Sequence, residues 1–201
     1  MDTTERVAPG PIGGPARSAA PAERLLATAS HLFAANGIRA VGIDRILRDS
    51  GCAKASLYSS YGSKDALVLA YLSQLDQADR NRWRRAVETA TDPAVKVLTF
   101  FDLAARGARQ RDFRGCLYAN AAAEFPGVPL TPVRAHRRWV RATLTELVRE
   151  LGASDPAAIA REVLLLYDGA LTASKLERSV QPIRDARRLA ARALDRAQGG
   201  D

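Results

Sequence analysis

The stretch that decides the fold is Gly37–Lys64, GIRAVGIDRILRDSGCAKASLYSSYGSK. Apolar residues at helical spacing predict a short amphipathic helix over Ile43–Ser50. Gly51 follows, and a glycine there lets the backbone adopt the left-handed conformation that ends a helix at low cost. A second short helix is predicted over Lys54–Ser60, with Leu57 on its buried side. Two short helices around such a turn form a helix-turn-helix, whose second helix fits the major groove of DNA.

The same region resembles the DNA-binding part of the TetR family of bacterial transcriptional repressors. The resemblance covers about residues 22–72 and rests on the ordered run Lys-x-Ser-Leu-Tyr-x-x-Tyr-Gly-Ser-Lys, which ends at Lys64. Two departures concern helix starts, because Val41–Gly42 and Ala53 stand where the family often has hydroxyl residues. Each departure removes an N-cap oxygen, typically worth about 1 kcal/mol. The apolar pairs that also carry the resemblance are Leu25–Leu26, Leu32–Phe33 and Ile43–Ile46.

Composition bounds the fold class more firmly than it bounds the function. The 201 residues are 47% hydrophobic, rich in Ala, Leu and Arg and poor in β-branched runs, which favours an all-α fold. The formal net charge is +8, but residues 1–64 hold only 8 Lys and Arg against 5 Asp and Glu. The positive charge is therefore spread along the chain and is weak evidence for DNA binding.

Cysteine usage and hydropathy indicate a cytoplasmic protein without membrane contact. Cys52 and Cys116 are the only cysteines, and the helical pattern places them in different parts of the fold, which fits a reducing compartment. No apolar run approaches the roughly 20 residues of a membrane span. The N-terminus also lacks the apolar core of a signal peptide.

About nine helices and no strand are expected, organised in three parts. Residues 1–21 are rich in Pro, Gly and Ala and should form a disordered arm. Residues 22–66 should form the helix-turn-helix unit, and residues 67–201 a ligand-binding and dimerisation domain. The arm carries Arg6 and Arg17, which would suit an adjacent minor groove, although an inert tail is the simpler alternative.

The predicted DNA contacts divide into phosphate contacts that position the protein and base contacts that specify sequence. The resemblance implies that Tyr58 and Lys64 grip backbone phosphates and that Ser56 contacts a phosphate or a base edge. Lys54 suits either role. The full set of predicted DNA-binding residues is Arg45, Lys54, Ser56, Tyr58, Ser59, Ser60 and Lys64.

The resemblance also implies a small-molecule effector inside the C-terminal helices that releases the protein from DNA. The sequence offers an apolar and aromatic lining with a few polar groups, the usual character of ligand pockets, although any one of these aromatics is otherwise simply core. The effector is therefore expected to be largely apolar or aromatic, and neither a cofactor nor a metal is expected. The predicted ligand-binding residues are Phe100, Phe101, Cys116, Asn120, Phe125, His136, Trp139 and Tyr167.

Cys116 raises a second possibility. It lies four residues before Asn120 on one helical face of a helix predicted over residues 114–124. The run Arg-Gly-Cys-Leu with a following Asn resembles a subset of the family, some of whose members respond to electrophiles or oxidants. A reactive thiol needs a pKa lowered by nearby positive charge, for which Arg114 is the candidate. The alternative is a small buried hydrophobe.

The end of the chain predicts a homodimer. Val163–Tyr167 is apolar around more than a full turn, so it must be covered on both sides. We expect two helices from each copy to pack as a four-helix bundle, as the resemblance also implies. Such a dimer fits a palindromic operator whose half-sites lie roughly 34 Å apart or a multiple of that. The predicted dimer residues are Leu164, Leu165, Leu171, Ile183, Ala186 and Ala190.

The pattern as a whole predicts a ligand-responsive repressor and not an enzyme. We expect the ligand to shift the long helix that begins at Ser63, which moves the two DNA-binding units out of register. An enzyme on a helical scaffold is disfavoured, because no HExxH, G-x-S-x-G or phosphate-loop motif is present. A helical adaptor that binds protein is the other alternative, and it leaves Ser56, Tyr58 and Lys64 unexplained.

Overall fold

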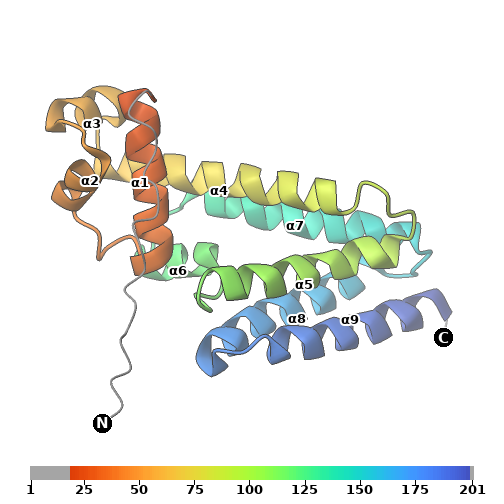
Figure 1. The fold of residues 1–201 in the computed structure, drawn as a ribbon. Helices are drawn as coiled ribbons and strands as arrows, with labels where there is room; N and C mark the ends of the chain where they lie inside the picture. The colour runs from red at the N-terminus through yellow and green to blue at the C-terminus, as the bar shows by residue number, and fades with distance from the viewer. Residues whose placement is uncertain (1–18, 200–201) are drawn as a thin grey trace, which may run out of the picture.

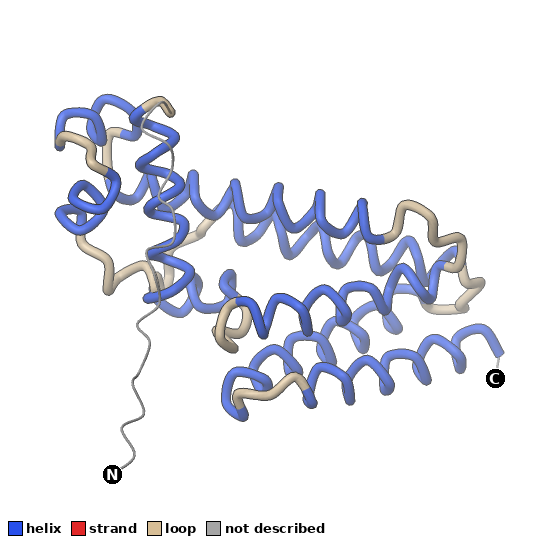
Figure 2. Tube along the Cα trace, viewed as in Figure 1, coloured by secondary structure: helices blue, strands red, loops and turns tan. Residues whose placement is uncertain are grey.

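The computed structural model describes residues 19–199 and confirms the all-α prediction. Nine helices account for this part of the chain, and Figures 1 and 2 show them as a compact head joined to a longer body of nearly parallel helices. The predicted arm lies almost wholly in residues 1–18, outside the described residues, and the first helix already begins at Pro21. The helices are α1 (Pro21–Asn36), α2 (Ile43–Ser50), α3 (Lys54–Tyr61), α4 (Lys64–Ala86), α5 (Pro93–Gln110), α6 (Leu117–Glu124), α7 (Thr131–Glu150), α8 (Pro156–Glu177) and α9 (Gln181–Gly199).

Local chemistry sets the ends of the helices around the turn. Gly51 ends α2 in the left-handed conformation at φ 63°, as its position predicts. Gly42 and Ala53 precede α2 and α3 without a side-chain cap, which agrees with the missing hydroxyl groups. Ser63 does cap α4, because its hydroxyl accepts a hydrogen bond from the backbone N–H of Ala66 at 3.1 Å.

The head, formed by α1–α3 and the first turns of α4, has its own apolar core. Ile46, Leu57 and Leu67 are fully buried there and hold α2, α3 and α4 against α1. Tyr61 packs under the turn and its hydroxyl donates to the carbonyl oxygen of Ala22 at 2.8 Å. Residues of α4 up to Leu72 belong to this core, so the head extends past the boundary predicted at residue 66.

The body, formed by α4–α9, is built around a second apolar cluster. Helices α5, α7, α8 and α9 pack on one another, and Phe101, Val148 and Leu194 lie at the centre. The predicted helix over residues 114–124 begins only at Leu117. Its expected first turn is taken by a loop in which Asp112, Phe113 and Gly115 have positive φ, a conformation that no helix continues through.

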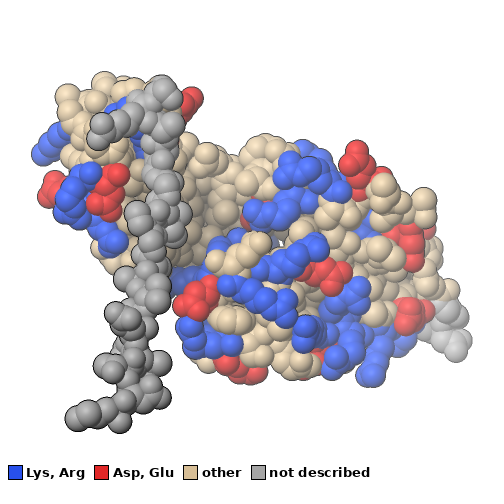
Figure 3. Space-filling view, viewed as in Figure 1, with Lys and Arg blue, Asp and Glu red and all other residues tan. Residues whose placement is uncertain are grey.

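Two surface features bear on partners. Figure 3 shows lysine and arginine side chains over the body as well as the head on the face in view, interspersed with carboxylates. This agrees with a positive charge that is spread along the chain. Among residues 19–199, none of the helices has the length and apolar character needed for a membrane span.

Candidate DNA interface and ligand cavity

The outer face of α3 presents short polar groups around one aromatic ring. Leu57 is fully buried and anchors the helix to the head, which leaves Lys54, Tyr58, Ser59 and Ser60 exposed. Tyr58 is 45% exposed, and its ring lies 6.0 Å from the Lys54 Nζ atom. The exposed ring of Tyr58 and its polar neighbours are therefore available to contact a partner, while Leu57 fixes the position of the helix.

Three other predicted DNA contacts have partners within the chain. The Lys64 Nζ atom donates to the carbonyl oxygen of Ile38 at 3.1 Å, which leaves two of its three N–H groups for a phosphate. Arg45 forms an ion pair with Asp49 at 3.6 Å and keeps 43% of its side chain exposed. Ser56 is half-buried and its carbonyl oxygen accepts from the Ser59 hydroxyl.

The body contains a cavity of about 80 Å³ between α4, α5, α6, α7 and α8. That volume exceeds the space of one water molecule several-fold but is below the roughly 300–1,000 Å³ of most ligand pockets, so an organic ligand there must be small or must widen the cavity. Of the eight predicted ligand-binding residues, the structure places five in its wall. These five are Phe100, Cys116, His136, Trp139 and Tyr167.

The other three predicted residues lie outside the cavity. Phe101 is 1% exposed and belongs to the body core. The Asn120 amide donates to the carbonyl oxygen of Arg114 at 2.8 Å and accepts from Lys175 at 3.0 Å, so it closes a loop. Phe125 packs against the head core, because α6 ends at the head and carries its last residues away from the cavity.

Aromatic rings form one side of the cavity. Trp83 stacks on Phe100 with 5.2 Å between ring centroids, and Trp139 meets Trp83 edge-on at 6.0 Å. Tyr167 meets Phe100 edge-on at 6.4 Å. Trp83 was not among the predicted ligand-binding residues, because it is embedded in a run of arginines. Its spacing of eight residues from Leu75, on the apolar side of the same helix, was the available signal.

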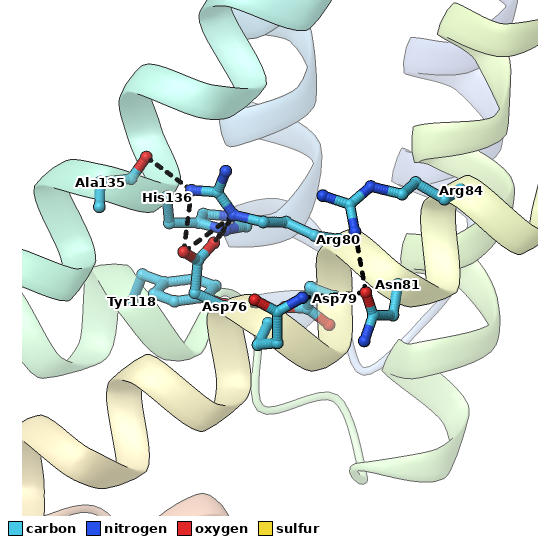
Figure 4. A network of polar contacts seen from close by, with 9 residues as sticks. Asp76, Asp79, Arg80, Asn81, Arg84, Tyr118, Ala135 and His136 are labelled. Carbon is cyan, nitrogen blue, oxygen red and sulfur yellow. Dashed lines mark hydrogen bonds and ion pairs between the residues drawn. The ribbon is translucent and has the colours of Figure 1, made fainter.

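The polar side of the cavity is tied to α4 by two carboxylates (Figure 4). Asp76 accepts from His136 Nδ1 at 2.9 Å and from Arg80 at 2.9 Å. Because this carboxylate is paired with Arg80, it acts as the acceptor, and His136 Nδ1 carries the proton. Burial lowers the pKa of His136 below 6.5, and the hydrogen bond to Asp76 opposes part of that effect.

Asp79 provides the second tie to α4. The Tyr118 hydroxyl donates to Asp79 at 2.9 Å, and Arg82 pairs with the same carboxylate at 2.8 Å. Burial and the neighbouring Asp79 charge raise the pKa of Tyr118, so its hydroxyl stays protonated. Its ring stacks on His136 with 3.8 Å between centroids. Two neighbouring cavity residues from α6 and α7 are thereby fixed to the helix that leads to the head.

Cys116 lies in the cavity wall as a protonated thiol. Burial raises its pKa, and the hydrogen bonds from the backbone N–H groups of Ala119 and Tyr118 only partly oppose that rise. The activation expected from Arg114 is therefore not what its surroundings provide. Cys116 serves instead as the cap of α6, accepting from the Ala119 N–H at 3.5 Å.

The far end of α6 contacts the head directly, which the sequence did not suggest. The two carboxylate oxygens of Glu124 accept from the backbone N–H of Ile38 at 3.1 Å and of Arg39 at 2.6 Å. These amides belong to the loop between α1 and α2. One short helix and its N-cap thus contribute Tyr118 and Cys116 to the cavity and Glu124 to the head.

The predicted dimer surface needs correction. Five of the six predicted dimer residues are buried within the single chain. The small-residue stripe of α9 packs against α5 and α8 of the same copy. Only Leu165 is on the surface, where it is 70% exposed. It begins an exposed strip along α8 that continues through Gly169 and Thr172 to Leu176, which is 79% exposed. The five buried residues are Leu164, Leu171, Ile183, Ala186 and Ala190.

Comparison with known proteins agrees with this architecture. The family described as "Bacterial regulatory proteins, tetR family" matches residues 25–71, which span the head. The crystal structure of SCO4454, a TetR-family transcriptional regulator from Streptomyces coelicolor, superposes with a TM-score of 0.81 at 34% identity, covering 89% of this chain and 96% of that one.

Curated relatives point the same way. The transcriptional regulator AcuR of Cereibacter sphaeroides is 27% identical over 86% of this chain and 84% of its own length. The HTH-type transcriptional repressor KstR2 of Mycolicibacterium smegmatis is 25% identical over 57% of this chain and 56% of its own. This chain, with an exposed face on its third helix and a cavity between its body helices, belongs to the TetR family of DNA-binding transcriptional regulators, which are not enzymes.

Proposed function

We propose that this transcriptional regulator is a cytoplasmic repressor that binds a palindromic operator as a homodimer and is released by a small molecule in the body cavity. The observation that carries the DNA-binding part is the outer face of α3. Lys54, Tyr58, Ser59 and Ser60 are exposed together on a helix that Leu57 fixes in place. We propose repression, and not activation, because TetR-family regulators are most often repressors and the relative KstR2 is described as a repressor.

Release by ligand is supported by the ties between the cavity and α4. A molecule that enters the cavity displaces Tyr118 or His136, and both are hydrogen-bonded to carboxylates of α4. Helix α4 continues without a break from the cavity to Lys64 at the head. A ligand changes DNA affinity only if it binds the two head positions with different affinity. The hydrogen bonds Tyr118–Asp79 and His136–Asp76 can make the affinity for a ligand depend on the position of α4 and therefore on the position of the head.

Dimerisation is supported by the exposed strip on α8. Leu165, Gly169, Thr172 and Leu176 follow a spacing of four, three and four residues, which is the seam of a helix pair. Gly169 faces open space, so a partner helix can approach its backbone closely. Two heads on one duplex double the contacts that a single small polar face provides.

A binding selection followed by a shift assay tests this function. The full-length protein selects from random duplexes, and the enriched sequence and the DNA upstream of its own reading frame are then used as probes. The proposal expects an inverted repeat, two protomers per duplex and retention that weakens steeply with salt. An unselective outcome, or retention of one protomer on a single half-site with full affinity, contradicts it.

Electrophile sensing through Cys116 is the second candidate and is less well supported. The raised pKa of the thiol keeps it in the unreactive form at neutral pH. Treatment with N-ethylmaleimide at pH 7 distinguishes the two candidates. The effector-binding proposal expects slow labelling of Cys116 in the folded protein, whereas sensing requires labelling much faster than that of a free thiol.

A further inference from the structure

Arg111 introduces a positive charge into the cavity without a matching carboxylate. Its side chain lines the cavity, and its Nε atom is buried and lacks a hydrogen-bond partner. No carboxylate of residues 19–199 lies within ion-pair distance of Arg111. Arg82, the other arginine in the wall, is already paired with Asp79 at 2.8 Å and is 44% exposed. Arg111 is half-buried, and its buried Nε donor can be satisfied by an acceptor in the cavity, so this position favours a ligand that carries an anionic acceptor group.

The last turns of α5 make room for this guanidinium. A Cβ atom at Gly107 would lie 2.6 Å from Arg111 Nη2 and 3.2 Å from its Cζ, so the group occupies space that only a glycine leaves free. Glycine within a helix costs about 1 kcal/mol relative to alanine. The charge also reaches the aromatic residues, since it lowers the pKa of Tyr71 and Tyr167 against the larger effect of burial.

We propose that the effector is a planar aromatic monoanion whose carboxylate pairs with Arg111 while its ring lies among Trp83, Phe100, Trp139 and Tyr167. A guanidinium offers a fork of N–H donors that matches a carboxylate. Asp79 lies in the same wall, and its negative charge disfavours a dianion such as a phosphate monoester. This inference rests on the proposed function, because it names the chemical class of ligand for the same cavity.

The test uses a matched pair of single-ring probes, benzoate and its neutral analogue benzamide, with the full-length protein. Isothermal titration should give the carboxylate at least about tenfold higher affinity than the amide. Arg111→Gln should abolish this preference, and Arg111→Lys should restore part of it. Arg109→Gln is the control, since it removes the same charge from an exposed position on α5 outside the cavity.

A second variant moves the guanidinium without removing it. Gly107→Ala places a methyl group where the flexible end of Arg111 lies, so the chain folds and the charge shifts. The carboxylate preference should shrink in this variant. Both tryptophans of the chain line the cavity, so their fluorescence reports whether a probe has entered it.

Each outcome decides the proposal. Equal affinity for acid and amide, an unchanged preference in Arg111→Gln, or no binding of either probe overturns it. These results are distinct from a failure of the proposed function, which is read separately in the operator shift assay. If benzoate binds through Arg111 without changing DNA retention, the anion site holds and release by this ligand fails.

Discussion

Two carboxylates one turn apart on α4, Asp76 and Asp79, hold His136 and Tyr118 in place at the cavity. Each is shared with an arginine of the same helix, so the charge remains balanced when the cavity side changes. Because each carboxylate contacts both a ring side chain and an arginine of α4, the proposed release by ligand would pass small displacements of the two rings to this long helix. It also makes protonation of His136 a measurable feature of the folded state.

His136→Gln should flatten the pH dependence of stability on the acid side. Because burial lowers the pKa of His136 in the folded chain, the unfolded chain binds a proton first as pH falls below about 6.5. The free energy of unfolding of the wild type should therefore decrease from pH 7 toward pH 5, and the variant should lose part of that decrease. Urea titrations at each pH measure it.

The control for this prediction is His31→Gln, which removes the other histidine of the chain from an exposed position on α1. It should keep the slope of the wild type. If His136→Gln instead steepens the loss of stability on acidification, His136 is charged in the folded state and the stated tautomer is incorrect.

Single residues were predictable from sequence where local pattern decides their position. Leu57 and Tyr61 have a fixed place within a short helix-turn-helix, so spacing alone places them. Phe125 was wrongly predicted to line the cavity, and Trp83, which does line it, was not predicted. Whether a residue lines the cavity depends on how helices distant in sequence cross. The lone charge of Arg111 was not visible either, since a missing counter-ion is a property of the folded chain.

At the scale of an element, α6 is the shortest link between the cavity and the head. Its N-terminal part carries Cys116 and Tyr118 in the cavity wall, and Glu124 at its end binds two amides of the α1–α2 loop. A carboxylate that accepts hydrogen bonds from two backbone N–H groups holds the end of α6 and the α1–α2 loop against each other. Movement of α6 would therefore be felt by the loop that precedes the helix-turn-helix.

Glu124→Ala should free that loop. Two backbone donors lose their acceptor, and we expect stability to fall by about 1–3 kcal/mol. Amide hydrogen exchange at Ile38 and Arg39 should accelerate more than exchange at the buried amides of α1. Glu88→Ala serves as the control, because Glu88 is exposed and follows α4 far from this loop. Unchanged exchange at both amides would show that Glu124 does not hold the loop.

Helix positions were mostly accessible from sequence, and their exceptions have physical causes. Caps, prolines and glycines mark most ends, so α2 was predicted with its observed bounds over Ile43–Ser50. The start of α6 was misplaced because Asp112, Phe113 and Gly115 adopt positive φ, and of these three only Gly115 gives a signal in the sequence. Tertiary contacts impose that loop, and periodicity does not report it.

For the whole molecule, five of the six residues predicted to meet a second copy are buried within the single chain. A stripe of small residues on α9 resembles an interface, but it serves the packing of a single chain. On α8 the exposed large apolar side chains are Leu165 and Leu176, at the two ends of the strip, and on the described part of α9 the exposed one is Leu189. Only the folded chain distinguishes the two, because both have helical spacing.

Leu165→Glu should separate the dimer into monomers. A carboxylate at the first residue of the strip loses solvent when a partner helix covers it, so the dissociation constant should rise at least about tenfold. Sedimentation equilibrium measures it. Val95→Glu is the control, because Val95 is 47% exposed on α5 outside the strip. A Leu165→Glu protein that dimerises as tightly as the wild type would place the interface elsewhere.

The most direct test of the account is an anisotropy titration of the selected operator with the double variant Lys54→Gln, Tyr58→Ala. Both side chains are exposed, and Arg106→Gln removes an equal charge from an exposed site on the body as a control. We predict a loss of affinity of at least about 100-fold and a salt slope smaller by about two, since each of two heads loses a phosphate contact. Wild-type affinity and slope in the folded double variant would contradict the claim that α3 binds the operator.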